Sequence, residues 1–485
     1  MSFAVVGVLA YLALGLVGLL RGGKVTGLSA IAVGVVTLIL WAPGFPPALL
    51  GEAPWGITLV GDRVALAFWA LAPLAHAAVW WTARRRPGTF HALVTLLVGT
   101  CLATVISKDL FNLYVLLDLG SLLTVVLLSY DQRSRAVWAA LQYLFLSAVG
   151  MILYLLGVAL VYGHLGTLSL VEIAKFSSGF SSPALAVGAG LLVAGAAVKA
   201  GVFLLGFWLP AAYRHAPTEA VILFATLSGK MGIVALARLA EAFPVGVLLT
   251  ALGVITGFGG LLYALWEKDL KLFLAYHTIS QLGYTLIGLG FGGAAAQAGI
   301  LFAIAHCLFK GLLFLAGGQA VDAVGARELP ELVGKVPSAA AWGLAMGTAS
   351  IVGVPPLAAF VAKEFLGLTL PAGFSWVLFS LSLGTAASFA KIIPLLRPGP
   401  GKVERGGLIL LTSGLMAFSL WGLVSLPELW KAAVWGKALA AVAAGYGVYF
   451  LARRFQPKLP RLTMERALVL IFIVASALSL SLLFS

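Results

Sequence analysis

Long apolar segments follow one another along almost the whole chain, and this pattern constrains the fold more than any other feature of the sequence. Cutting the chain at charged or Gly/Pro-rich breaks leaves about sixteen segments of roughly 18–25 residues, the length of a helix that crosses a bilayer. Only 10% of the 485 residues are charged, against about 25% in an ordinary soluble protein. We therefore expect an all-α polytopic membrane protein with about 14–16 transmembrane helices.

Basic residues are distributed unevenly between the connectors. Odd-numbered connectors carry about three times as many Lys and Arg residues as even-numbered ones, and the positive-inside rule then places both termini outside the cytoplasm. The net charge of +14 is explained by these cytoplasmic loops. Since no soluble basic domain is present, we expect a multi-pass protein of the cell (plasma) membrane, in contact with the lipid bilayer and without a nucleic-acid partner.

The cysteine pattern offers no cofactor site. The two cysteines, Cys101 and Cys307, lie far apart in different apolar segments, so they form neither a disulfide framework nor a metal-binding motif. We therefore expect no cofactor and no metal. The polar connectors are too short to fold alone, which leaves the function within the membrane or with partner subunits.

Ionisable residues within the apolar segments are the strongest functional signal. Lys199 and Lys230 lie near the middle of theirs, where an ammonium group costs about 2.5–3.5 kcal/mol on insertion scales. Asp118 is an acidic residue in the middle of an uninterrupted segment. Its carboxyl group is either protonated and hydrogen-bonded to a neighbouring helix, or paired with a lysine, for which Lys199 is the natural candidate. Such a pair can couple a change in geometry to the release of a proton.

A second group of ionisable residues follows later in the chain. Lys310 comes four residues after His306, so both project from one helical face, and His277 lies in the preceding segment. Amines and imidazoles joined by hydroxyls and water are the components of a proton relay. A structural hydrogen bond is the alternative for each histidine, and snorkelling to the membrane surface is the alternative for Lys391.

Two apolar segments are interrupted by prolines. The first is broken near Pro210 and Pro217, with His215 between them, and the second is broken at Pro355 and Pro356. The two segments are five spans apart, a pattern typical of repeated transporter halves with sites at the breaks. An odd number of helices per repeat makes the two copies inverted. Simple proline kinks in packing helices are the alternative.

At these residues the chain resembles the antiporter-like subunits shared by Mrp-type multisubunit sodium/proton antiporters, respiratory complex I and membrane-bound hydrogenases. The segments FWLPAAYRHAPTEA and LSGKMGIVALARL are most similar to the D subunits of Mrp antiporters. Three more segments resemble further motifs of the same family: EKDLKLFLAYHTISQLGY, AHCLFKGLLFLAGG and GVPPLAAFVAKEFL. The similarity extends over about two-thirds of the chain, and the ordered set of motifs is specific where no single motif is.

The resemblance implies a fold of two inverted five-helix repeats, each with one broken helix. The predicted divisions are N-terminal transmembrane helices in 1–86, a first repeat in 87–243, a second repeat in 244–400 and C-terminal transmembrane helices in 401–485. By motif, Asp118 stands where the family has its fifth-helix glutamate and Lys199 is the paired lysine. Lys230 is the eighth-helix lysine, and Lys363 is the residue expected to face the exit. The central polar axis would hold His277, His306 and Lys310.

Two departures from the family pattern bear on this assignment. Asp118 replaces a glutamate, which shortens the reach to Lys199 by one methylene. Glu219 replaces an apolar residue, and the sequence assigns no role to it.

Three functions remain open at this point. The first is a transporter subunit that moves protons, or exchanges a monovalent cation such as Na⁺ for protons, within a hetero-oligomeric membrane complex. The second is the same chain acting as the pumping subunit of a complex I-like or hydrogenase-like redox complex. The third is a stand-alone carrier of an organic solute, which the sequence favours least because its polar residues follow an axis and do not surround a cavity.

Overall fold

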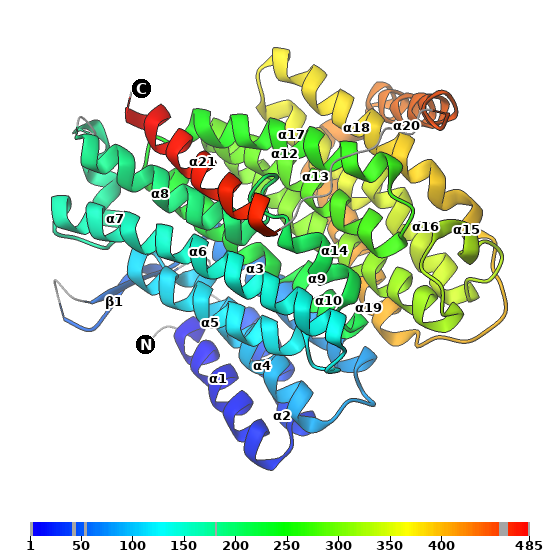
Figure 1. Cartoon of the computed structure of the whole chain (residues 1–485), viewed down its shortest axis with the longest axis horizontal. Helices are drawn as coiled ribbons and strands as arrows, with labels where there is room; N and C mark the ends of the chain where they lie inside the picture. Colours follow the sequence, from blue (N-terminus) through cyan, green and yellow to red (C-terminus); the bar gives the residue numbers. More distant parts are fainter. Residues whose placement is uncertain (1–2, 41–44, 53–55, 180–181, 455–463, 484–485) are drawn as a thin grey trace. The chain divides into compact units, whose positions relative to one another are not determined.

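The computed structural model describes residues 3–40, 45–52, 56–179, 182–454 and 464–483. Within these residues the chain is almost entirely helical (Figure 1). It divides into two compact units, one formed by Met1–Leu249 with Leu462–Ser485 and the other by Thr250–Arg461. The predicted repeat boundaries stay a prediction.

The first unit contains most of the N-terminal half of the chain and the last helix. Its longer helices are α1 (Phe3–Arg21), α2 (Gly23–Ile39), α3 (Arg63–Thr82), α4 (Gly88–Ile106), α5 (Leu110–Leu128), α6 (Ser134–Leu165), α8 (Pro183–Ala200), α11 (Met231–Ala242) and α21 (Met464–Leu483). Its shorter elements are β1 (Phe45–Leu50), β2 (Ile57–Gly61), α7 (Leu170–Ile173), η1 (Ala174–Gly179), α9 (Trp208–His215), α10 (Thr218–Thr226) and η2 (Ser228–Lys230). Helix α21 packs along α8, although more than 200 residues separate them (Figure 1).

The second unit is built around one long helix. Its elements are α12 (Gly246–Trp266), which begins in the first unit, α13 (Leu270–Phe291), α14 (Gly293–Val324), α15 (Leu329–Leu332), α16 (Ser338–Val352), α17 (Ala358–Thr369), η3 (Ala372–Phe374), α18 (Ser375–Phe389), η4 (Ala390–Leu396), α19 (Gly406–Ser425), η5 (Pro427–Trp430) and α20 (Ala432–Ala452). Helix α14 packs against α13, α16, α17 and α19. In the most apolar stretch of α14, 94% of the residues are buried, so this helix forms the centre of the unit.

The architecture confirms the predicted all-α polytopic membrane fold. Thirteen helical segments in the described residues are long and apolar enough to cross a membrane, and α2 and α16 are shorter apolar helices. Together with the more polar α13, these elements account for the predicted spans. Inverted repeats within this architecture remain a prediction.

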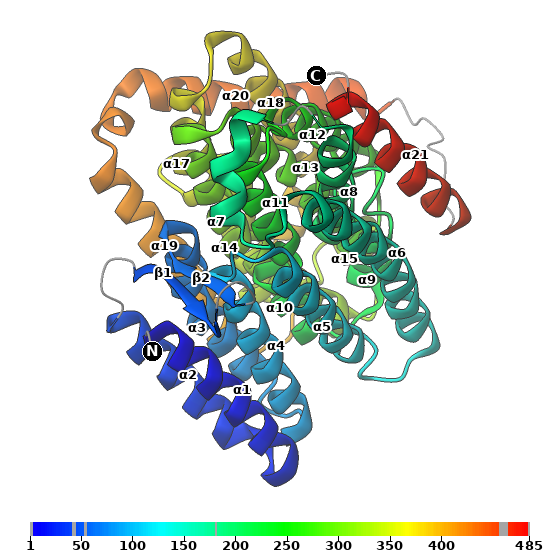
Figure 2. The same cartoon turned by 90° about the vertical axis from the view of Figure 1, so that its left-hand side faces the viewer.

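The apolar composition of Val25–Leu50 predicts a single helix over these residues, and this prediction is wrong. Helix α2 ends at Ile39, and Phe45–Leu50 forms strand β1, which pairs antiparallel with β2 (Figure 2). The reason is local: Pro46 and Pro47 have no backbone N–H, so they cannot continue a helical hydrogen-bond ladder, whereas a two-stranded hairpin tolerates them at its edge.

The first helix break begins earlier than predicted, whereas the predicted interruption at Pro217 does lie between α9 and α10. Helix α8 ends at Gly201, which has φ +75°, and α9 begins only at Trp208, so Pro210 lies inside the first turn of α9 and not at the break. A glycine in the left-handed region terminates α8, and proline is tolerated in the first turn of the next helix. The indole of Trp208 donates to the Val198 carbonyl at 3.1 Å, which satisfies one of the carbonyl groups exposed by the break.

The second break lies where the sequence places it. Helix α16 ends at Gly353 (φ +93°), and α17 begins at Ala358, so Pro355 and Pro356 fall in the connecting turn. Two 3₁₀ segments were not predicted. Lys230 ends the 3₁₀ turn η2 between α10 and α11, and Lys391 lies in the 3₁₀ segment η4 that follows α18. Of the two, η2 lies within a longer helical run, and a 3₁₀ stretch in such a place often marks a functional hinge.

Candidate functional site

Lys199 lies in the last turn of α8, and its amine is enclosed by hydroxyl groups. The side chain is 3% exposed. Its Nζ donates to the Leu117 carbonyl of α5 at 3.2 Å, to Ser147 Oγ of α6 at 2.5 Å and to Ser121 Oγ of α5. Tyr143 Oη donates to the same Ser121 hydroxyl at 3.0 Å. A hydroxyl can donate or accept, so this cluster offers partners to both the charged and the neutral amine.

Asp118 lies beside this cluster, on the outer side of α5. One carboxylate oxygen is 4.0 Å from Lys199 Nζ, at the outer limit of an ion pair, and the Asp118 side chain is 43% exposed. The hydroxyls of Ser121 and Ser147 are nearer to the amine than the carboxylate is. The structure thus brings together the two residues that the sequence pairs, with hydroxyl groups as the closer partners of the lysine.

A small cavity extends from Lys199 toward the η2 turn. It has a volume of about 20 Å³, enough for one water molecule. Its polar lining comes from Thr100, Thr104, Ser121, Thr124, Tyr143, Lys199 and Ser228. Thr124 Oγ1 lies 3.5 Å from Ser228 Oγ, and Ser228 starts the turn that ends at the buried Lys230. The first unit therefore connects the surroundings of Lys199 to η2 through hydroxyl groups.

Glu219, which the sequence leaves without a role, belongs to an ion-pair cluster. It lies in the first turn of α10, and its carboxylate pairs with Arg86 at 3.0 Å. Arg86 also pairs with Asp131 at 2.5 Å. Burial lowers the pKa of Arg86, but hydrogen bonds and charge from Glu219 and Asp131 outweigh it and raise that pKa overall. The cluster holds the start of α10 to the connectors before α4 and after α5.

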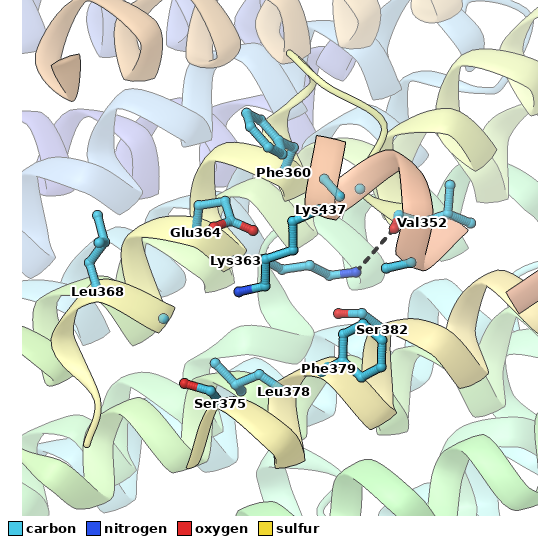
Figure 3. A pocket seen from close by; sticks show the side chains of 14 residues that line it. Val352, Phe360, Lys363, Glu364, Leu368, Ser375, Leu378, Phe379, Ser382 and Lys437 are labelled. Atoms are coloured by element: carbon cyan, nitrogen blue, oxygen red, sulfur yellow. Dashed lines mark hydrogen bonds between the residues drawn. The ribbon is translucent and has the colours of Figure 1, made fainter. Parts of the chain in front are cut away.

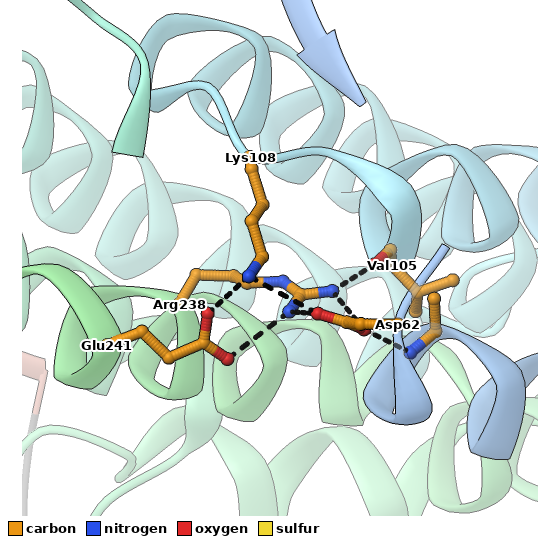
Figure 4. A network of polar contacts seen from close by, with 6 residues as sticks. Asp62, Val105, Lys108, Arg238 and Glu241 are labelled. Atoms are coloured by element: carbon orange, nitrogen blue, oxygen red, sulfur yellow. Dashed lines mark hydrogen bonds and ion pairs between the residues drawn. The ribbon is translucent and has the colours of Figure 1, made fainter. Parts of the chain in front are cut away.

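A second ionic cluster lies near the other end of these helices (Figure 4). Arg238 of α11 is fully buried; it donates to the Val105 carbonyl at 2.7 Å and to both carboxylate oxygens of Asp62. Lys108 pairs with Glu241 at 2.5 Å and with Asp62 at 3.3 Å. Burial raises the pKa of Asp62, yet the charge and hydrogen bonds of Arg238, with help from the Ala65 N–H and Lys108, hold it below its ordinary value. The cluster fixes α11, which follows directly on Lys230.

In the second unit, Lys363 meets the exposed end of the broken helix. Its Nζ donates to the carbonyls of Ile351 at 3.0 Å and Val352 at 3.5 Å, the last residues of α16. These carbonyls lack helical donors because α16 stops there, and the negative end of the helix dipole favours an ammonium group. The amine also lies 5.4 Å from the centre of the Tyr284 ring.

Lys363 borders a cavity of about 160 Å³ (Figure 3). Glu364 of the same helix, Lys437 of α20, and Ser375 and Ser382 at the α18 side also line it. A cavity of this size holds several water molecules. Two amines and one carboxylate therefore share a space that water can enter.

A polar stripe between α13 and α18 leads away from this cavity. Tyr284 Oη lies 3.0 Å from Ser382 Oγ, Gln281 Nε2 donates to Thr385 Oγ1 at 3.3 Å, and His277 Nε2 lies 2.6 Å from Ser388 Oγ. The participating residues recur at helical spacing on both helices, so each pair is one turn from the next. The stripe runs from Ser382 at the cavity to His277.

Lys310 and Lys391 lie close enough to His277 for their charges to act on it, as does Lys363. Lys310 Nζ donates to the Leu274 carbonyl at 2.7 Å. Lys391 Nζ donates to three carbonyls at the end of α12, those of Ala264, Leu265 and Glu267, at 2.7, 3.0 and 2.9 Å. The surroundings of these two lysines thus differ from the hydroxyl cluster around Lys199.

The remaining predicted residues are His306, His215 and Pro217. His306 is fully buried on α14, one turn before Lys310, and its ring lies 5.4 Å from that of Phe309. His215 ends α9, and Pro217 precedes α10, so both mark the connection between the two short helices. In the described residues, no group of three or more His, Cys, Asp or Glu side chains is arranged to hold a metal ion.

Sequence reasoning missed the hydroxyl residues of both sites. These are Ser121, Tyr143 and Ser147 in the first unit and Ser382, Thr385 and Ser388 in the second. The spacing of Ser382, Thr385 and Ser388 at every third position in an apolar helix is a signal that was available. For Ser121 and Ser147, which lie on different helices, only the packing of α6 against α5 and α8 brings them to one amine.

The sequence is similar to those of known proteins. Residues 107–390 match the family model described as NADH:quinone oxidoreductase/Mrp antiporter, transmembrane. The chain is 33% identical to the N subunit of NADH-quinone oxidoreductase from Desulforudis audaxviator, over 73% of this chain and 74% of that protein. It is 30% identical to the D subunit of the Na⁺/H⁺ antiporter from Alkalihalophilus pseudofirmus, over 68% of this chain and 71% of that protein.

Two solved structures share the fold. A chain of the membrane-bound sulfane sulfur reductase, an archaeal respiratory membrane complex, superposes with a TM-score of 0.75 at 21% identity, covering 93% of this chain and 98% of the other. A chain of the Mrp complex from a Dietzia species superposes with a TM-score of 0.73 at 20% identity, covering 99% of both chains.

Proposed function

The chain belongs to the NADH:quinone oxidoreductase/Mrp antiporter transmembrane family, and from this premise we propose that it is the proton-translocating subunit of a multisubunit membrane complex. Its intramembrane lysines and histidines, with the exception of Lys391, carry the protons, and the surrounding hydroxyl groups and water connect them. The subunit transports ions and carries out no chemical conversion of its own.

The observation that carries this proposal is the hydrogen-bonding capacity around Lys199. A proton relay needs an amine that has hydrogen-bond partners both with and without its extra proton. Ser121 and Ser147 accept hydrogen bonds from the ammonium form, and either hydroxyl can turn to donate to the lone pair of the neutral form. Asp118, 4.0 Å from the amine, stabilises the charged form. An increase in this distance weakens the attraction and favours release of the proton from Lys199.

Lys363 has the same property by a different arrangement. The carbonyls of Ile351 and Val352 take two N–H groups, which a neutral amine also possesses. The remaining position, a third N–H or a lone pair, is available to water in the neighbouring cavity. Lys363 therefore suits the step at which a proton is exchanged with water, and we place the exit there.

Lys391 has a different role in this proposal. Its three carbonyl partners match the three N–H groups of an ammonium ion, and a neutral amine would leave one carbonyl without a donor. We assign to Lys391 a fixed positive charge that caps α12. Its amine lies 4.6 Å from the Phe273 ring, which in turn packs 4.8 Å from the ring of His277, so this charge sets the electrostatic environment of the polar stripe.

The proposed order of transfer follows the motifs of the family. Protons enter near Asp118 and Lys199, pass Lys230 and the region of His277, His306 and Lys310, and leave near Lys363. The hydroxyl-lined cavity before η2 and the stripe between α13 and α18 support the first and last of these steps.

Two sources of energy fit this protein. Similarity to the D subunit of a Na⁺/H⁺ antiporter favours exchange of Na⁺ or another monovalent cation for protons. Similarity to the N subunit of NADH-quinone oxidoreductase favours a redox complex in which electron transfer in other subunits drives the pump. In both cases the partners are other membrane subunits, and we place the assembly in the plasma membrane.

The test uses the native assembly, purified from the membrane and also assayed in inverted vesicles. An antiporter dissipates an imposed pH gradient when Na⁺, Li⁺ or K⁺ is added, and its subunits are all membrane proteins. A redox pump builds a pH gradient on addition of an electron donor and co-purifies with iron–sulfur or nickel subunits. An assembly that moves protons under neither condition would refute the proposal.

A further inference from the structure

A groove lies between the N-terminal ends of α16 and α19 in the second unit, and none of its residues belongs to the relay proposed above. Its volume is about 310 Å³, at the lower end of the range of about 300–1,000 Å³ that is usual for ligand sites. One face of each helix lines it at helical spacing: Ser338, Ala339 and Trp342 on α16, and Arg405, Leu408 and Ile409 at the start of α19.

The groove is apolar along most of its length. Leu408 is buried at its base and packs against α16 at Gly343, where an added Cβ would lie 2.9 Å from Leu408 Cδ2. Trp342 and Ile409 flank the opening, with 48% and 59% of their surface exposed. The groove therefore presents an apolar surface to the surroundings of the two helices.

The position of the groove is at the end of the apolar spans. Helix α19 is long and apolar enough to cross a membrane, α16 is a shorter apolar helix, and both begin at the groove. The connectors that precede them are joined by a hydrogen bond from the Gly399 amide to the Val336 carbonyl at 2.7 Å, so both connectors lie on one side of the membrane. Trp342 thus occupies the boundary between apolar core and headgroups, where tryptophan is enriched.

These connectors carry an excess of positive charge. Residues 333–337 and 397–405 contain four basic side chains and one acidic side chain, Glu404. The Glu404 carboxylate accepts hydrogen bonds from two backbone amides at the start of α19, at 2.7 and 3.2 Å. Lys335, Lys402 and Arg405 are exposed, and within the described ranges no carboxylate forms an ion pair with any of these three. By the positive-inside rule this end of the helices faces the cytoplasm.

We propose that the groove binds one anionic phospholipid of the cytoplasmic leaflet. Its phosphate pairs with the Arg405 guanidinium, whose N–H groups match phosphate oxygens, and accepts a hydrogen bond from the Ser338 hydroxyl. One acyl chain lies in the groove against Leu408. Basic pockets between transmembrane helices on the cytoplasmic side favour anionic headgroups, and Lys335 and Lys402 add to this preference.

The distribution of charge favours a lipid over a partner helix as the occupant. The cations are confined to the connector end of the groove, and the walls beyond Arg405 are apolar. A phospholipid has the same division, with one anionic end and an apolar remainder. The groove and a single anionic lipid are therefore complementary in both charge and polarity.

The test is quenching of Trp342 fluorescence in the native assembly, reconstituted into phosphatidylcholine bilayers. Increasing fractions of phosphatidylglycerol with brominated acyl chains are added, because bromine quenches an indole only at short range. The chain has 13 tryptophans, so the Trp342 signal is taken as the difference between each protein and the same protein carrying Trp342→Phe. We expect brominated phosphatidylglycerol to quench Trp342 at a lower mole fraction than brominated phosphatidylcholine does.

Arg405→Gln tests the headgroup contact, and Arg84→Gln is its matched control. Arg84 is another exposed arginine in a connector, between α3 and α4 of the first unit. One basic residue near the membrane surface changes the affinity for anionic lipid about fivefold. Arg405→Gln should therefore raise the half-quenching fraction of phosphatidylglycerol about fivefold, and Arg84→Gln should leave it unchanged, at equal amounts of assembled complex.

Three results would overturn the proposal. They are equal quenching of Trp342 by the two brominated lipids, an unchanged half-quenching fraction in Arg405→Gln, and no quenching of Trp342 by either lipid. The last result would show that a partner subunit covers the groove. All three would leave the transport proposal untouched, because lipid binding is measured without proton movement.

Discussion

Replacing lysine by arginine separates a lysine that releases its proton from one that holds a fixed charge. Arginine retains a positive charge and hydrogen-bond donors but does not deprotonate under physiological conditions. Lys363 has two carbonyl partners and borders a water-accessible cavity, whereas Lys391 has three carbonyl partners. We expect Lys363→Arg to abolish proton transport and Lys391→Arg to preserve it.

The size of the effect follows from these environments. The reference pKa of arginine is at least about 2 units above that of lysine, so an obligatory deprotonation at position 363 becomes at least about 100-fold rarer. At position 391 the guanidinium can serve the same three carbonyls, and we expect transport within about threefold of wild type. Lys391→Met, by contrast, removes three hydrogen bonds from a charged donor, each worth about 1.5–3 kcal/mol, and should lower the stability of the assembly.

The assay is the initial rate of proton movement in inverted vesicles, normalised to the amount of assembled complex. Lys437→Arg, which changes another lysine lining the Lys363 cavity, is the matched control and should retain the wild-type rate. Wild-type transport by Lys363→Arg would refute the assignment of Lys363 as a proton carrier. Equal losses in Lys363→Arg and Lys391→Arg would refute the distinction between the two lysines.

Three further predictions concern the packing and ion pairs that hold the first unit in place. A methyl group at Gly232 of α11 would lie 2.6 Å from the Lys199 carbonyl carbon. Gly232→Ala should therefore destabilise the protein by about 1–3 kcal/mol and displace Lys199. In the control Gly120→Ala the nearest atom to the new methyl group is 3.7 Å away, so thermal unfolding should be unchanged. Because the pKa of Asp62 is held below its ordinary value, its ion pairs stabilise the folded state when the pH is above that ordinary value. The difference in melting temperature between wild type and Asp62→Asn should therefore shrink as the pH falls below about 4. A difference that does not change with pH would contradict this. A double-mutant cycle of Arg86→Gln and Glu219→Gln should give a coupling energy of about 0.5–1 kcal/mol, as for a partly exposed pair, and zero coupling would show that the contact is not formed.

Hydropathy and charge were sufficient to predict the membrane architecture. Apolar length identifies the spans because a bilayer leaves the backbone few alternatives to a helix. The prediction failed at Val25–Leu50, where apolar composition continues past the end of α2 but Pro46 and Pro47 turn the chain into a hairpin strand. Here the absence of backbone N–H groups outweighs hydrophobicity.

The titratable centres of the site were predictable, but their partners were not. A lysine in an apolar segment is conspicuous, which is why Lys199, Lys310 and Lys363 stand out. Whether each lysine meets hydroxyls, carbonyls or a carboxylate depends on contacts between distant helices, as between Lys391 and the end of α12. The exact location of the first break was also missed, because Gly201 ends α8 well before the more conspicuous Pro210.

The most direct test of the central claim is proton movement by the assembly carrying Lys199→Ala or Lys230→Ala, measured in inverted vesicles beside the surface variant Lys175→Ala. Lys175 is 65% exposed and pairs locally with Glu172, so its variant controls for the loss of a positive charge. We predict that both buried-lysine variants lose proton movement while Lys175→Ala retains it. Wild-type rates in Lys199→Ala and Lys230→Ala would contradict the account.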